Sequence, residues 1–132
     1  MSMMNAHLRV ARPTDQLDDV IKFYRDGLGF DVLFQFADHD GFDGVMLGHK
    51  DAPYHLEFTR RHGHQSGKAP TQENLLVFYL PDREDWQSVV IRLEEHGFNP
   101  TRSFNPYWDN NGKTFADPDG YRIVLQNGSW PP

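Results

Sequence analysis

The sequence predicts an α+β fold built from two copies of one supersecondary module. Two features support the duplication: Gly29 and Gly97 are 68 residues apart, and the segments 54–58 and 121–125 are 67 residues apart. A period this long, present twice, is unlike a solenoid, which needs at least about three stacked repeats. In each copy one helical segment is followed by closely spaced strands. That order favours mostly antiparallel neighbours and an α+β arrangement over a doubly wound parallel sheet.

The length of the chain predicts one domain. At 132 residues it falls in the range of a typical domain, about 100–150 residues. We expect a single domain over residues 1–132, with module one at about 6–60 and module two at about 74–127. Residues 61–73 contain glycine, proline and several polar side chains, which is typical of a linker between modules.

Module one begins with a strand and a helix. Residues 7–11 alternate between polar and apolar side chains, which predicts a strand. Thr14 or Asp15 can cap the helix that follows, and Gly27 or Gly29 can end it. One face of this helix carries apolar residues at the spacing of a buried helical stripe, namely Leu17, Val20, Ile21, Tyr24 and Leu28.

Three strands complete module one. They are predicted at residues 31–36, 44–47 and 55–59. Residues 38–41 read Asp-His-Asp-Gly, a composition typical of the turn between the first two.

Module two repeats this order. Residues 75–80 predict a strand, and Asp82 caps a helix that ends at Gly97. Trp86 and Leu93 belong to its apolar face. Three further strands are expected at residues 99–104, 113–116 and 121–126.

Composition excludes several classes of partner. The net charge of −6 argues against nucleic-acid binding, which needs a basic face. No apolar run approaches the length of about 18 residues that a membrane span requires, and no secretory signal is evident. Cysteine is absent, which excludes disulfides and thiolate metal sites. We therefore expect a cytoplasmic protein without nucleic-acid or membrane partners.

Three motifs carry a resemblance to a known group of proteins. Phe23-Tyr24 is followed by Leu-Gly-Phe at 28–30, residues 117–125 read Asp-Pro-Asp-Gly-Tyr-Arg-Ile-Val-Leu, and residues 105–108 read Asn-Pro-Tyr-Trp. Over roughly residues 6–127 the chain resembles the vicinal oxygen chelate superfamily, which includes glyoxalase I, extradiol dioxygenases and the bleomycin- and fosfomycin-resistance proteins. The resemblance implies two βαβββ modules that form a curved, incomplete mixed-sheet barrel around a ligand cleft. It also implies a homodimer, since many relatives dimerise.

The resemblance further implies where a divalent ion would be bound. In metal-dependent relatives the ligands come from the first and last strands of the modules. Glu57 falls on the last-strand position of module one, and either His7 or Arg9 falls on the first-strand position. The equivalents in module two are Leu75 and Val124, which offer no donor atom. We therefore expect no metal cofactor; the alternative is one divalent ion held by His7 and Glu57.

A polar group can take the place of a metal in this cleft. His55 shares the face of Glu57 through the two-residue period of a strand, Arg9 has the same inward parity, and Arg122 is the counterpart of His55. A carboxylate in a partly apolar cleft needs a partner, so we expect an arginine–Glu57 pair. Glu57 and His55 are the candidate catalytic pair for proton transfer without a metal.

Aromatic side chains complete the predicted cleft. Tyr107 and Trp108 lie in a polar loop, where large rings need either the rim of the domain or a ligand to cover them. Tyr79 has inward parity on its strand. The predicted ligand-binding residues are therefore Arg9, Tyr79, Tyr107, Trp108 and Arg122.

These observations favour a protein that binds a small, partly aromatic molecule in a metal-free cleft. The alternative is a metal-dependent enzyme of glyoxalase or dioxygenase type, with its ion on His7 and Glu57. A third reading is an interaction module, in which Tyr107 and Trp108 would lie on an exposed face.

Overall fold

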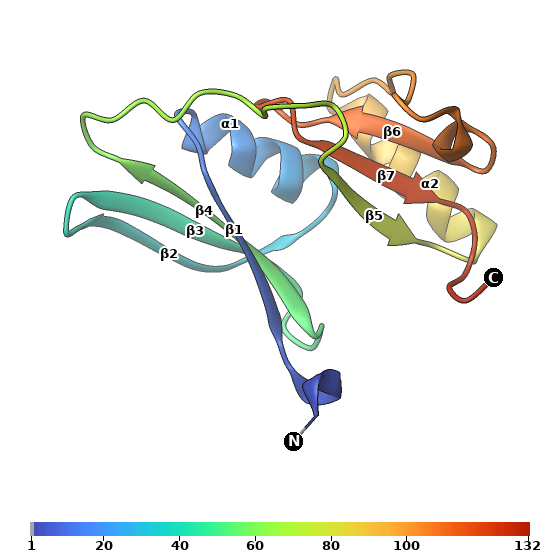
Figure 1. Cartoon of the computed structure of the whole chain (residues 1–132), viewed down its shortest axis with the longest axis horizontal. Helices are drawn as coiled ribbons and strands as arrows, with labels where there is room; N and C mark the ends of the chain where they lie inside the picture. The colour runs from blue at the N-terminus through green and yellow to red at the C-terminus, as the bar shows by residue number, and fades with distance from the viewer. Residues whose placement is uncertain (1) are drawn as a thin grey trace.

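Each half of the chain forms its own β-sheet in the computed structural model, which describes residues 2–132 (Figure 1). The first sheet has the strand order β1-β4-β3-β2, and the second has the order β5-β7-β6. The strands of the first sheet are β1 (Leu8–Pro13), β2 (Asp31–His39), β3 (Phe42–Gly48) and β4 (Tyr54–Arg61). Those of the second are β5 (Leu75–Tyr79), β6 (Gly112–Ala116) and β7 (Arg122–Gln126).

The two sheets repeat one pairing scheme. In each, the first strand of the module runs parallel to the last, β1 to β4 and β5 to β7, and the other pairs are antiparallel. The sheets are therefore mixed, and they do not close into a barrel. The predicted α+β class with two related modules and an incomplete barrel is confirmed.

One predicted strand is wrong. Residues 99–104 form only a single bridge, Thr101 to Thr114, so the second sheet has three strands. The backbone N–H of Ser103 donates to the carboxylate of Asp109 at 3.2 and 3.3 Å instead of to a neighbouring strand. Pro100 contributes no N–H at all. The segment is thus held as a loop over the sheet.

The first helix also starts differently from the prediction. Helix α1 (Leu17–Ile21) begins after Gln16 and continues as the π-helical segment η2 (Lys22–Gly27). Asp15 does not cap it, because its carboxylate accepts from the backbone N–H groups of Ser66 and Gly67 at 2.7 and 2.8 Å. These two hydrogen bonds tie the linker between the modules to the start of α1.

The second helix follows the prediction closely. Helix α2 (Arg83–Glu95) is capped by Asp82, whose side chain accepts from the N–H of Asp85 at 3.0 Å. Gly97 follows the helix with a φ of 86°, a left-handed conformation that favours glycine. Among the described residues, no helix is long and apolar enough to span a membrane.

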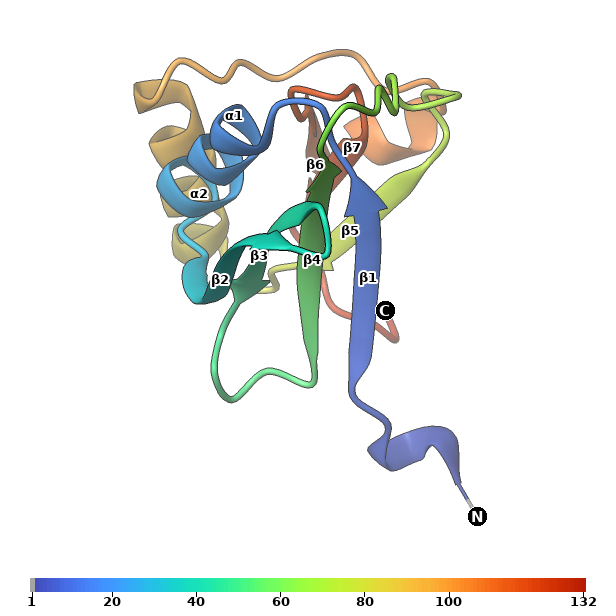
Figure 2. The ribbon, with the colours of Figure 1, turned by 90° about the vertical axis from the view of Figure 1, so that its left-hand side faces the viewer.

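Both modules contribute to one hydrophobic core. Figure 2 shows α1 and α2 together on one side of the sheets. Leu56 and Phe58 of β4 and Ile123 and Leu125 of β7 are all buried in the same cluster as apolar residues of both helices. Because side chains alternate along a strand, the residues between them point to the opposite face of each sheet.

A buried hydrogen bond joins the two modules. The hydroxyl of Tyr24, on the helix of module one, donates to Asp117 Oδ2 at 2.7 Å. The other carboxylate oxygen, Oδ1, accepts from the N–H groups of Asp119 and Tyr121 and so shapes the turn that leads into β7. Burial raises the pKa of Asp117, and the bond from Tyr24 opposes that rise.

We expect Tyr24→Phe to lower the free energy of unfolding by about 1–3 kcal/mol, because the substitution leaves a buried carboxylate oxygen without its donor. Urea denaturation followed by circular dichroism measures this change. Tyr79→Phe, which removes the same hydroxyl from a partly exposed position, is the matched control and should be nearly neutral. Equal destabilisation by the two substitutions would contradict this role for Tyr24.

Candidate functional site

A group of four side chains, joined by hydrogen bonds and one ion pair, lies on the first sheet. Arg9 Nε donates to His55 Nε2 at 2.8 Å, and Arg9 Nη1 lies 3.5 Å from Glu57 Oε2. His55 Nδ1 is 2.6 Å from His7 Nε2. We call these four residues, His7, Arg9, His55 and Glu57, the Arg9 cluster.

The strand register produces this cluster. In the parallel pair β1–β4, Arg9 lies opposite His55, and Ala11 lies opposite Glu57. His55 and Glu57 alternate with core residues of β4, so they occupy the face of the sheet that points away from the core. The sequence-predicted contact between Arg9 and Glu57 is therefore present, and His7 joins it through His55.

The hydrogen bonds fix the protonation of His55. Because a guanidinium can only donate, His55 Nε2 must accept from Arg9, which makes the imidazole neutral with its proton on Nδ1. That Nδ1–H donates to His7 Nε2. The pKa of His55 is lowered, mainly by desolvation and then by the positive charge of Arg9, while Glu57 opposes the shift.

The donor set of this region does not fit a divalent metal ion. The facing nitrogens of His7 and His55 are bonded to each other, and Glu57 faces the guanidinium of Arg9. A fixed positive charge next to the carboxylate opposes the approach of a cation. Among residues 2–132, no group of three or more His, Cys, Asp or Glu side chains is arranged to hold a metal.

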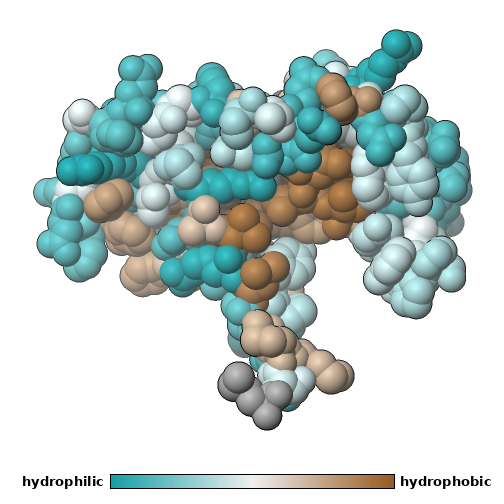
Figure 3. Space-filling view, in the orientation of Figure 1, coloured by the Kyte–Doolittle hydropathy of each residue, from teal (hydrophilic) through white to brown (hydrophobic). Residues whose placement is uncertain are grey.

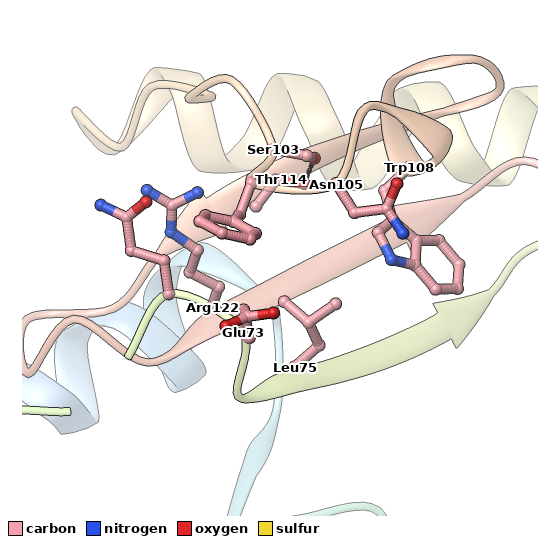
Figure 4. Close-up of a pocket in the computed structure, with 9 residues that line it drawn as sticks. Glu73, Leu75, Ser103, Asn105, Trp108, Thr114 and Arg122 are labelled. Carbon is pink, nitrogen blue, oxygen red and sulfur yellow. Dashed lines mark hydrogen bonds between the residues drawn. The ribbon is translucent and has the colours of Figure 1, made fainter. Parts of the chain in front are cut away.

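A pocket of about 160 Å³ lies on the second sheet. Figure 4 shows Leu75 on β5, Arg122 on β7, and Trp108 on the short helix η3 (Pro106–Asp109) around it. Its lining consists of Gln72, Glu73, Leu75, Ser103, Phe104, Asn105, Trp108, Thr114 and Arg122. These residues come from the end of the linker, from β5, β6 and β7, and from the loop that precedes β6.

The loop over this sheet is tightly held. The hydroxyls of Ser103 and Thr114 are hydrogen-bonded to each other beneath it (Figure 4). A Cβ atom at Gly112 would lie 2.8 Å from the carbonyl oxygen of Trp108, so glycine permits the loop to approach β6. Val124 is fully buried on this side of β7. The pocket wall that carries Trp108 is therefore fixed to the sheet.

The structure places the predicted site residues in two groups. His7, Arg9, His55 and Glu57 form the Arg9 cluster, and Trp108 and Arg122 line the pocket. Among the described residues, no hydrogen bond or ion pair joins the two groups. Because both sheets bury their opposite faces in one core, each group points away from that core.

Two predicted aromatic residues lie outside the pocket lining. Tyr107 is 60% exposed and packs edge-on against Trp108, with ring centroids 5.0 Å apart. Tyr79 is 39% exposed and lies 6.3 Å from the ring of Trp130.

Sequence analysis missed five polar lining residues and one ring. One of them, Thr114, lies on β6. The other five lie in irregular segments, where no strand or helix period indicates the direction of a side chain. Only the neighbouring Asn-Pro-Tyr-Trp motif offered a signal, for the residues of that loop. These five residues are Gln72, Glu73, Ser103, Phe104 and Asn105.

Comparison with known proteins assigns the family. Residues 8–59 match the model of the YycE-like N-terminal domain, and residues 73–127 match that of the YycE-like C-terminal domain. The chain is 44% identical to the uncharacterized protein YycE of Bacillus subtilis (strain 168) over 126 residues, which cover 96% of this chain and 91% of YycE. The chain belongs to the YycE-like family.

Solved structures place this family in a larger group. The crystal structure of B. subtilis YycE matches with a TM-score of 0.87 over 95% of this chain and 91% of that one. Glyoxalase I of Leishmania major matches with a TM-score of 0.71 at 25% identity, over 92% and 86% of the two chains. TnmS3, an antibiotic binding protein from Streptomyces sp. CB03234, shares the fold with a TM-score of 0.66 at 23% identity, over 96% and 97%. The predicted membership of the vicinal oxygen chelate superfamily is confirmed.

We expect His55 to titrate below its ordinary pKa of 6.5 and Arg9→Gln to raise that pKa, because the substitution removes a neighbouring positive charge. Since the folded-state pKa is lowered, the contribution of His55 to stability is complete above 6.5 and is lost as the pH falls through the lower value. NMR titration of the imidazole signals measures the pKa. The control is Arg61→Gln, which removes a positive charge from β4 six residues beyond His55. A His55 pKa that does not respond to Arg9→Gln would contradict the assignment.

Proposed function

We propose that this protein binds a small, partly aromatic molecule without a metal, in the pocket on the second sheet. The observation that carries the proposal is the lining of that pocket, where Leu75 and Trp108 stand beside a single buried charge, Arg122. An apolar, aromatic wall with a few convergent polar groups is the usual composition of a small-molecule site.

The positions that a metal would need support the same proposal. Leu75 and Val124 offer no ligand on the second sheet, and on the first sheet Arg9 supplies a cation beside Glu57. A divalent ion would have to displace this guanidinium and break the His7–His55 hydrogen bond. A metal-dependent enzyme with its ion on His7 and Glu57 is therefore the less favoured function.

A neighbour of the same fold illustrates the proposed kind of activity. TnmS3 is by name an antibiotic binding protein, whereas the L. major protein is a glyoxalase. Because one fold hosts many activities, the choice between binding and catalysis rests on the residues of this chain. Glu57 and His55 keep the candidate role in proton transfer if the bound molecule reaches the Arg9 cluster.

We further propose that the protein acts as a homodimer. Strand β2 exposes large apolar side chains, including Phe34 at 57%. Figure 3, in the orientation of Figure 1, shows hydrophobic surface over β5. Monomeric proteins rarely leave large apolar patches in contact with water. A second copy of the chain would cover these side chains, and it would provide further walls for a pocket that is small in one chain.

Native mass spectrometry together with elemental analysis tests both proposals on one sample. After growth with added Zn²⁺, Ni²⁺ and Mn²⁺, we expect the mass of a dimer of 15.3-kDa chains with far less than one ion per chain. The same result is expected for Glu57→Gln. A near-equimolar ion that is lost in Glu57→Gln would overturn the metal-free proposal, and a monomer at micromolar concentration would overturn the dimer.

Ligand-observed NMR with a set of single-ring aromatic fragments tests the pocket itself. We expect saturable binding of some fragments, and we expect Trp108→Ala to weaken it by about fivefold or more, because the ring loses its stacking surface. Trp130→Ala, at an exposed position near the C-terminus, should leave binding unchanged. Equal losses of fragment binding in both variants, or binding that neither variant affects, would show that the fragments bind outside this pocket.

A further inference from the structure

We propose that the ligand of this pocket is a carboxylate, of the size of a single aromatic ring, whose anionic group pairs with Arg122. This inference rests on the proposed function and names the chemical class of the molecule that the pocket binds.

Arg122 is a buried cation without a counter-ion. The residue is 8% exposed, and its Nη1 donates to the carbonyl oxygen of Arg102 at 3.0 Å. No carboxylate between residues 2 and 132 forms an ion pair with it, since none lies within 4.0 Å. A guanidinium stays protonated in proteins, and a buried charge is normally paired. An anionic ligand would supply the counter-ion that Arg122 lacks.

The two carboxylates of a neighbouring hollow are already used. Asp117 and Asp119 line this hollow, which Arg122 also lines. Asp117 accepts from Tyr24 and from backbone N–H groups, and Asp119 Oδ1 accepts from Gln16 Nε2 at 3.0 Å. Neither of them neutralises Arg122.

Among the other polar groups of the pocket, Asn105 leaves a donor for a ligand. Ser103 and Thr114 bond to each other through their hydroxyls. Asn105 Oδ1 accepts from the N–H of Tyr107 at 3.0 Å, which leaves its amide NH₂ as the group that a ligand can meet. The paired donors of the Arg122 guanidinium suit the two acceptor oxygens of a carboxylate.

The apolar wall and the volume set the size of the remainder. Leu75, Phe104 and Trp108 are the apolar and aromatic members of the lining, and Leu75 is the register partner of Arg122 on the neighbouring strand. Figure 4 shows Leu75 and Trp108 facing the same space. A cavity near 150 Å³ is about the size that holds a benzene ring. The pocket, at about 160 Å³, therefore suits one flat ring packed on Trp108 with its carboxylate turned to Arg122.

Glu73 provides an internal test of the sign of the charge that the ligand carries. It lines the same pocket but is exposed, so its carboxylate stays solvated and repels an anion only weakly. Removing this charge should strengthen the binding of an anion and should weaken the binding of a cation.

The experiment is isothermal titration of the full-length protein with benzoate, with its uncharged analogue benzamide, and with benzylamine. We expect benzoate to bind at least about tenfold more tightly than either of the others. Glu73→Gln should strengthen benzoate binding roughly twofold, and Arg122→Gln should weaken it by about tenfold or more. Arg102→Gln, which changes an exposed side chain of the neighbouring loop, should have no effect. Thermal melting shows whether each variant is folded.

Each outcome bears on one claim. Benzamide that binds as well as benzoate, or Glu73→Gln that weakens benzoate, would overturn the assignment of an anion while the small-molecule site stands. Fragments that bind nowhere, charged or neutral, would overturn the proposed function itself. Because Glu73→Gln and the benzamide comparison leave Arg122 in place, they decide the question even where Arg122→Gln does not fold.

Discussion

The functional surfaces of this protein depend on one constraint, which is the shared core between the two modules. Strands β4 and β7 each turn alternate residues into that core, Leu56 and Phe58 from one and Ile123 and Leu125 from the other. The residues between them must face away from it, because strand side chains alternate. The core thus determines which positions are available for function, and those positions can change their chemistry without repacking the interior. The two faces differ accordingly: that of the first sheet is polar and hydrogen-bonded, and that of the second holds an apolar pocket.

Arg9 gives the first sheet its particular chemistry. Its guanidinium contacts both His55 and Glu57, and His55 passes a hydrogen bond to His7. The nitrogens and the carboxylate oxygen that face one another in this cluster are paired within the protein, through contacts of modest strength because Arg9 is partly exposed. In this account the protein supplies its own fixed cation in place of a bound ion. The second sheet shows the reverse arrangement, with a buried cation, Arg122, whose partner is the proposed ligand.

The sequence predicted those features that follow from a fixed period or from one residue with one conformational role. The two-residue period of β4 was enough to place His55 and Glu57 on one face with Arg9, and the cap at Asp82 and the turn at Gly97 were equally readable. The structure of segments without such a period could not be predicted from the sequence. Residues 99–104 resembled a strand, yet the Asp109 carboxylate takes a backbone N–H that a strand would have used. Sequence parity also predicted one cleft with Arg9 and Arg122 in it, and this stays a prediction. Arg9 lies on the first sheet and Arg122 on the second, and parity within a strand does not determine how two sheets are oriented.

The tautomer of His55 tests the central claim most directly, since a guanidinium that donates to Nε2 permits one form only. Long-range ¹H–¹⁵N correlation spectra of the protein at neutral pH distinguish the two neutral tautomers and the imidazolium by their nitrogen shifts. With Arg9 in the position described, His55 is neutral, carries its proton on Nδ1, and shows a hydrogen-bonded, unprotonated Nε2. A proton on Nε2, or a doubly protonated ring, would mean that Arg9 does not donate to this histidine, and the account of a built-in cation would be wrong.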